Sequence, residues 1–192
     1  MFAQPTKMLE PDFNPFPEIQ TNRLLLRRMN EQDAGEILKL RSDENVMRYI
    51  DRKRAENIED AKQWLEIVEN ALDSNAGITW GIAKKENPGV LIGSIGYWRI
   101  IKEHYRAEVG YMLSQSFWRQ GIMKEALLKV IDFGFREMNL HSIEAHINTL
   151  NLASANILLS TGFVQEAHFK ENFFWEGTFR DTIVFCQVSG IG

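Results

Sequence analysis

The stretch Phe117-Trp118-Arg119-Gln120-Gly121-Ile122-Met123-Lys124-Glu125 decides the fold, because it joins a predicted strand to the longest helical pattern of the chain. Alternating apolar residues at 107–113 precede it, and apolar residues at helical spacing follow it from Ala126 to Phe135. A helix that begins near Gly121 directs unpaired backbone N–H groups, and the positive end of its dipole, at any anion in front of it. By itself, such a glycine more often marks a structural turn than a phosphate-binding loop.

Outward from this stretch, strand and helix patterns alternate along the chain. Asn30 is a plausible helix N-cap with Asp33 completing a capping box, and the segments 86–89 and 102–104 are predicted to be the turns of two hairpins. The predicted order is a strand at 23–28, helices within 37–50 and 64–72, strands at 78–83, 90–98 and 107–113, a long helix from 121, a strand at 142–147, a short helix at 153–160 closed by Gly162, and strands at 163–168 and 179–188.

This order predicts an α+β domain with one mixed, mostly antiparallel sheet of about six to seven strands, flanked by helices. We expect a single domain at 19–188, preceded by a Pro-rich lead at 1–18 and followed by a short tail at 189–192. The length of 192 residues fits one compact domain with a sizeable core. No Walker-type phosphate loop is present, and no Gly-x-Gly-x-x-Gly follows the first strand, so those two nucleotide folds are set aside.

Charge and composition narrow the class of partner. The formal net charge of −4 argues against direct binding of nucleic acid, and the run 52–54 is offset by Asp51 and Glu56. A mildly acidic protein instead suits a cationic partner such as an amine or a basic peptide. The single cysteine, Cys186, fits a reducing compartment and lies in an apolar alternating run that predicts a buried strand residue.

Targeting and metal signals are weak. The lead at 1–17 has no long apolar core, so we expect neither a signal peptide nor a membrane anchor, and the cytoplasm is the expected location. His141 and His146 are separated by an odd number of residues on a predicted strand, so they face opposite sides and predict no metal site.

The run 118–127 resembles the acetyl-CoA-binding motif of the GNAT N-acetyltransferase superfamily, whose pattern is Arg/Gln-x-x-Gly-x-Gly/Ala. Four further segments, in their order and spacing, resemble the RimJ/RimL-type branch, which acetylates ribosomal-protein N-termini: 23–27, 107–111, 151–154 and 162–164. The resemblance covers about residues 19–188. It implies direct attack of an amine on the thioester of acetyl-CoA, without an acyl-enzyme.

The chain departs from the family pattern at three positions. Trp118 replaces an Arg or Gln, Met123 replaces a small residue and is expected to crowd the loop, and Leu158 stands where many members have a catalytic tyrosine. The proton for the departing thiolate must therefore come from elsewhere.

The resemblance implies roles for particular residues. Glu108 corresponds to the family's acidic residue and is the candidate base, although a strand residue here could equally face solvent. Ser154 resembles the branch's serine and is the candidate proton donor, although it could equally cap the short helix. Asn151 would hydrogen-bond the pantetheine arm, and the backbones of Met112 and Leu113 would bind the acetyl carbonyl and the pantetheine amides. The pyrophosphate would lie against Trp118, Arg119, Gln120, Gly121, Ile122, Met123 and Lys124.

The expected function is transfer of an acetyl group from acetyl-CoA to a primary amine, with a protein N-terminus of the ribosomal-protein type as the leading acceptor. A small amine such as a polyamine, amino sugar or antibiotic is the alternative acceptor, and a non-catalytic acyl-CoA-binding module is a third interpretation, favoured by Leu158. Acceptor specificity is expected from the segments 47–64 and 173–179, with Trp98 and Phe174 lining the acceptor cleft. Both a monomer and a homodimer are compatible with the sequence.

Overall fold

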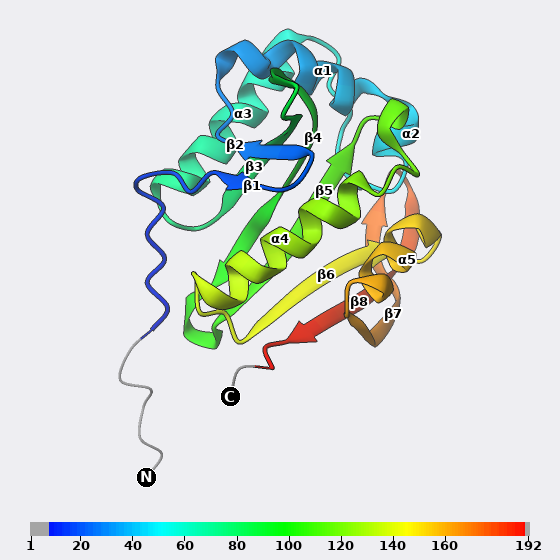
Figure 1. Cartoon of the computed structure of the whole chain (residues 1–192). Helices are drawn as coiled ribbons and strands as arrows, with labels where there is room; N and C mark the ends of the chain where they lie inside the picture. The colour runs from blue at the N-terminus through cyan, green and yellow to red at the C-terminus, as the bar shows by residue number, and fades with distance from the viewer. Residues whose placement is uncertain (1–7, 191–192) are drawn as a thin grey trace.

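The computed structural model, which describes residues 8–190, contains one eight-stranded sheet with helices on both faces (Figure 1). The strands are β1 (Ile19–Gln20), β2 (Leu24–Arg27), β3 (Ile78–Lys84), β4 (Asn87–Ile101), β5 (Arg106–Leu113), β6 (Ser142–Asn148), β7 (Val164–Trp175) and β8 (Thr178–Val188). The α-helices are α1 (Ala34–Ser42), α2 (Glu44–Met47), α3 (Ile58–Asp73), α4 (Ile122–Arg136) and α5 (Leu152–Ser160).

The strand order across the sheet is β1-β2-β3-β4-β5-β6-β8-β7, and every neighbouring pair is antiparallel except β5 and β6. The predicted α+β class and mixed sheet are confirmed. The additional strand is β1, whose two residues pair with Leu25 and Leu26 and are too short to show a pattern in the sequence. Asn30 and Asp33 form the predicted capping box, here on the 3-10 turn that leads into α1.

The predicted turn between β3 and β4 is wrong in its position. The chain reverses at Lys85 and Glu86, since Asn87 already pairs with Lys84. The next pair joins Leu91 to Ala83, so the residues between Asn87 and Leu91 form an irregular, bulged start of β4. Pro88 has no N–H group to donate to a regular ladder, and it is tolerated here because the ladder is interrupted.

Two apolar cores hold the helices against the sheet. The larger core packs α4 and α5 on one face, and the smaller packs α1 and α3 on the other. In the larger core the hydroxyl of Tyr97, on β4, donates to the carbonyl oxygen of Val130 in α4 at 2.8 Å. The helix can approach so closely because Gly134 has no side chain, and an added Cβ there would lie 2.2 Å from the Tyr97 oxygen.

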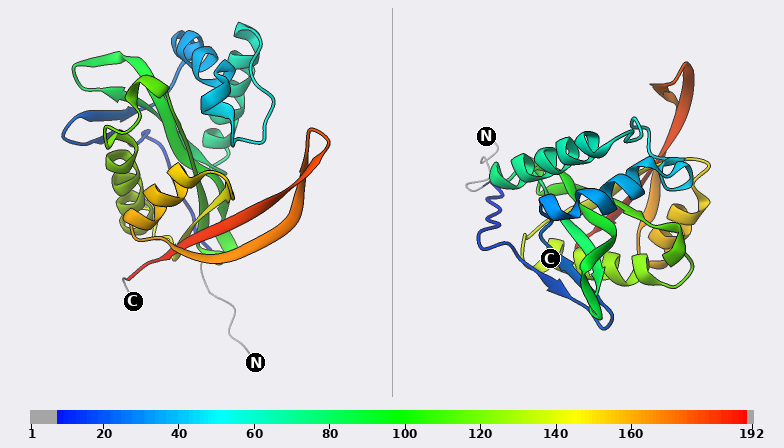
Figure 2. Two further views of the ribbon diagram at one scale, coloured as in Figure 1. Left: turned by 90° about the vertical axis from the view of Figure 1, so that its right-hand side faces the viewer. Right: turned by 90° about the horizontal axis from the view of Figure 1, so that it is seen from above.

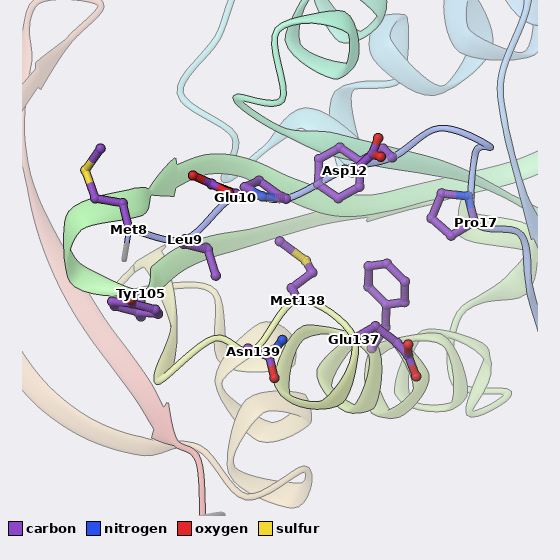
Figure 3. A pocket seen from close by; sticks show the side chains of 12 residues that line it. Met8, Leu9, Glu10, Asp12, Pro17, Tyr105, Glu137, Met138 and Asn139 are labelled. Carbon is purple, nitrogen blue, oxygen red and sulfur yellow. The ribbon is translucent and has the colours of Figure 1, made fainter. Parts of the chain in front are cut away.

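The segment before β1 packs onto the folded body, as Figure 3 shows at the C-terminal end of α4. Leu9 and Phe13 are buried, and the indole N–H of Trp80 donates to the carbonyl oxygen of Pro17 at 2.6 Å. Residues 8–18 of the Pro-rich lead are therefore part of the domain, while residues 1–7 and 191–192 lie outside the described residues. The hollow beneath this segment includes none of the predicted site residues.

The strands β5 and β6 pair with each other over only part of their length. Their parallel pairing covers only 106–108 of β5 and 142–144 of β6. Beyond this point β5 continues beside β4 as far as Leu113, and β6 continues beside β8 as far as Asn148. The residues 109–113 therefore have no strand partner on the β6 side, and we call this gap the opening.

The β7–β8 hairpin extends well beyond the other strands. Both views of Figure 2 show it sweeping away from the body, with its tip clear of the helices. Exposed apolar side chains mark its length, at Val164, Phe169, Phe174 and Phe179.

Candidate active site

The backbone of β5 faces the opening at alternate residues. Ser114 N–H donates to the carbonyl of Ile92 on β4 at 2.8 Å, so antiparallel alternation also directs the backbone groups of Met112 to β4. The groups of Tyr111 and Leu113 point the other way, into the opening. Met112, which the sequence placed on this edge, faces β4 instead.

The predicted pyrophosphate loop follows directly, and its backbone forms a concave turn before α4. Arg119 and Gly121 both have positive φ, 59° and 74°. No side chain caps α4, and the N–H of Glu125 donates to the carbonyl of Gly121 at 3.0 Å. The backbone N–H groups of the first helical turn are thus available to an anion. The side chains of Arg119 and Lys124 are exposed beside them.

An ion pair from another part of the chain braces this loop. Arg23, at the start of β2, donates from Nη1 to the carbonyl of Gln120 at 3.0 Å and from Nε to Glu125 at 2.7 Å. Burial alone would raise the pKa of Glu125, but hydrogen bonds from Thr21 and Arg23 outweigh it and lower that pKa. Glu125 therefore stays ionised and holds Arg23 against the loop.

The side chains of Trp118 and Met123 do not lie in the pyrophosphate loop itself. The indole N–H of Trp118 donates to the carbonyl of Leu113 at 2.7 Å, which fixes the ring at the end of the opening. The side chains of Ile122 and Met123 are buried in the larger core. The expectation that Met123 crowds the loop is therefore wrong, because only its backbone faces outward.

Glu108 lies on the face of β5 opposite to the larger core and is only 7% exposed. One carboxylate oxygen is 3.2 Å from Nη2 of Arg99, and the Trp98 side chain hydrogen-bonds the same carboxylate. Burial raises the pKa of Glu108 above its ordinary value, and His146 and Arg99 oppose that rise only in part. The solvent-facing interpretation is wrong, and a buried carboxylate of raised pKa suits a general base.

Tyr111 and Ser154 form a contact on the opposite side of the opening. Their hydroxyl oxygens are 2.6 Å apart. Ser154 does not cap α5, because Asn151 does so by accepting from the Ser154 N–H at 3.1 Å. Leu158, at the family's tyrosine position, is fully buried. No motif in the sequence pointed to Tyr111, although strand alternation already placed it on the face opposite to Glu108.

Of the two aromatic residues expected to line the acceptor cleft, only one lies beside the candidate base. Trp98 is half exposed and lies beside Glu108, in a place that Gly110 leaves open for its ring. Phe174 instead packs on Phe179 at the end of the β7–β8 hairpin, with ring centroids 4.9 Å apart. The structure therefore brings Trp98 to the candidate base but not Phe174.

Other chemistry has little support in residues 8–190. No three His, Cys, Asp or Glu side chains gather there closely enough to bind a metal ion, and no helix is long and apolar enough to cross a membrane. Cys186 is buried in β8, as predicted, and burial raises the pKa of its thiol to about 11.

Known proteins resemble the chain in sequence and in fold. The family described as an acetyltransferase (GNAT) domain matches residues 23–164. The uncharacterized N-acetyltransferase YoaA of Bacillus subtilis is 35% identical over 173 residues, which cover 90% of this chain and 97% of that protein. A ribosomal-protein-S5-alanine acetyltransferase from Vibrio fischeri has a similar structure, with a TM-score of 0.80 and 25% identity over 91% of this chain and 98% of the other. So does spermidine N-acetyltransferase from Vibrio cholerae, solved with CoA and spermine, with a TM-score of 0.77 and 23% identity over 88% of this chain and 96% of the other.

Proposed function

Because the chain belongs to the GNAT family of N-acetyltransferases, which use acetyl-CoA, we propose that it acetylates the N-terminal amine of a protein in the cytoplasm. Relatives that act on ribosomal proteins support this acceptor, as the RimJ/RimL-type resemblance implied. The single cysteine, which is free and buried, fits a reducing compartment.

The combination of the opening with the uncapped start of α4 carries the proposal. Backbone groups of Tyr111 and Leu113 offer an extended molecule the same hydrogen bonds as a neighbouring strand would. The carbonyl of Leu113 is already bonded to Trp118, so its N–H and both groups of Tyr111 remain for the pantetheine arm and the acetyl carbonyl. The loop 118–124 then receives the pyrophosphate, with backbone N–H groups and two exposed cations.

Glu108 performs the first step on its own face of the opening. A protein N-terminus is largely an ammonium group below its pKa of about 8, and its nitrogen cannot attack until a proton is removed. The Glu108 carboxylate accepts that proton, and a backbone N–H of the open edge donates to the carbonyl oxygen on which negative charge develops.

The sheet face around Glu108 supports a polypeptide acceptor. Glu144 and His146 share this face, because they occupy matching positions on β6. Beyond them β8 and β7 continue the same surface as the long hairpin, on which Phe169 is half exposed (Figure 2). This extended surface begins at Glu108, so it can contact several residues that follow the N-terminal amine of a polypeptide. A small amine would contact only the part of the surface next to Glu108.

Coenzyme A release, followed with a thiol-detecting reagent, tests this proposal. The purified chain is given acetyl-CoA with unblocked peptides, the same peptides with blocked N-termini, and a set of small amines that includes spermidine. We expect the highest kcat/KM with an unblocked peptide. The same peptide with a blocked N-terminus should release no coenzyme A. Preference for spermidine would move the acceptor to the small amines, and acetyl-CoA binding without release on any acceptor would favour the non-catalytic module.

A further inference from the structure

We propose that Tyr111 is a further catalytic residue of this transfer: held by Ser154, its hydroxyl donates a proton to the sulfur atom that leaves the acetyl group. The inference rests on the proposed function, since it assigns a role within the same site. Its starting point is the 2.6 Å contact between the two hydroxyl groups, which belong to residues 43 positions apart in the chain.

The location of Tyr111 connects it to the reacting atoms. Its backbone faces the opening, and its side chain lies on the α4 and α5 face of the sheet. Glu108 lies on the other face of the same strand. A thioester in the opening would therefore meet the base from one face and Tyr111 from the other. In the tetrahedral intermediate of acyl transfer the incoming nitrogen and the leaving sulfur are separate substituents of the same carbon, so a base on one face and an acid on the other can serve the two proton transfers.

Ser154 is placed to orient the phenol rather than to act alone. It is 6% exposed, and its backbone is fixed by the Asn151 cap in the first turn of α5. Burial raises the pKa of Tyr111 to about 12, while the hydrogen bond with Ser154 acts in the opposite direction. The phenol therefore keeps its proton at neutral pH and can serve as a donor. A phenol is also a much stronger acid than the aliphatic hydroxyl of serine.

The transfer forms one bond and breaks one bond at the acetyl carbon. The acceptor nitrogen forms a bond to the acetyl carbon after Glu108 has removed one proton, and the carbon–sulfur bond breaks with its electron pair remaining on sulfur. Tyr111 donates its hydroxyl proton to that sulfur, which completes the coenzyme A thiol. The Ser154 hydroxyl and the positive end of the α5 dipole stabilise the resulting phenolate. The new amide nitrogen loses its second proton, which water carries to Tyr111, and Glu108 releases its proton to the solvent.

The variant Tyr111→Phe keeps the ring and removes only the donor. We expect kcat to fall by about 10²- to 10⁴-fold, the usual contribution of a positioned acid, with little change in acetyl-CoA affinity measured by calorimetry. Ser154→Ala should lose less, and Tyr111→Phe/Ser154→Ala should be no slower than Tyr111→Phe alone, because the two residues act as one unit. A kcat for Tyr111→Phe equal to that of the wild type would overturn the proposal.

A matched control separates chemistry from packing. Tyr97→Phe also removes a buried hydroxyl that donates a hydrogen bond, but it lies away from the opening. We expect it to lower the melting temperature and leave kcat unchanged. Equal losses of kcat in Tyr97→Phe and Tyr111→Phe would assign Tyr111 a structural role only.

Replacement of Tyr111 by a fluorinated tyrosine gives a readout that packing cannot produce. Fluorine lowers the pKa of the phenol, so kcat should decline at mildly alkaline pH, where the wild-type enzyme keeps its rate. An unchanged pH profile would exclude Tyr111 as the donor. Wild-type protein that releases no coenzyme A with any acceptor would refute the proposed function itself, a result distinct from an active wild type with an equally active Tyr111→Phe.

Discussion

Glu108 illustrates how one residue can favour activity at the expense of stability. Burial makes the ionised carboxylate costly, which is why its pKa is raised despite Arg99 and His146. The folded protein consequently binds the proton of Glu108 more tightly than the unfolded chain does. The stabilising effect of that proton is present below the ordinary carboxyl pKa and is lost as the pH rises through the raised value.

The variant Glu108→Gln cannot ionise and therefore escapes this loss. We expect its melting temperature, relative to the wild type, to rise between acidic and neutral pH, while its kcat falls by about 10²- to 10⁴-fold. The rate deficit should be largest below pH ~8, where an N-terminal amine still carries its proton. Calorimetry should show unchanged acetyl-CoA affinity. A wild-type pH–rate profile would rule out Glu108 as the base.

Gly121 tests the loop at the level of a single side chain. In Gly121→Asp a carboxylate would face the pyrophosphate, and we expect the affinity for acetyl-CoA to fall by about tenfold or more, or about 1.4 kcal/mol. Gly121→Asn is the matched control, because asparagine has the same size and tolerates the positive φ but adds no charge. Calorimetry should give Gly121→Asn an affinity for acetyl-CoA between those of the wild type and Gly121→Asp. Equal affinity in all three proteins would sink the assignment of this loop.

At the scale of elements, the sequence predicts what is local and misses what depends on register. The strand before the loop and the helix after Gly121 both show their period in the sequence, so the loop could be located. The parting of β5 from β6 could not, because no pattern shows where two strands far apart in the chain stop pairing. The contact of Tyr111 with Ser154 was missed for the same reason.

Two helical glycines, Gly134 in α4 and Gly35 in α1, should change the stability of the protein in opposite directions when they are replaced by alanine. In Gly134→Ala the new Cβ would meet the Tyr97 oxygen at 2.2 Å, and such overpacking typically costs about 1–3 kcal/mol. For a chain of this size, each kcal/mol lowers the melting temperature by about 2–4 °C. Gly35→Ala in α1 is the control, because nothing lies within 4 Å of its Cβ position and alanine favours a helix by up to about 1 kcal/mol. Thermal unfolding that ranks Gly35→Ala below Gly134→Ala would contradict this packing argument.

At the scale of the whole molecule, one ion pair joins the segment 47–64, which is expected to help select the acceptor, to the residue directly after the second such segment, 173–179. Asp51, in the connection between α2 and α3, contacts Arg180 on β8, and both side chains are partly buried. These residues are 129 positions apart, so no sequence pattern could pair them. The pair fixes the outer part of the projecting hairpin, close to its turn, relative to the connection between α2 and α3, on the side of the sheet that carries Glu108.

Loss of this pair should loosen the acceptor surface without affecting the loop that holds acetyl-CoA. We expect Asp51→Asn and Arg180→Gln each to raise the KM for a peptide acceptor by up to about tenfold, since partly exposed pairs are worth roughly 1 kcal/mol. The acetyl-CoA affinity should not change. The exchanged double variant Asp51→Arg/Arg180→Asp should recover part of the loss, because the attraction is restored with its sign reversed. Peptide KM values that are equal in the wild type and both single variants would show that the position of the hairpin does not determine acceptor binding.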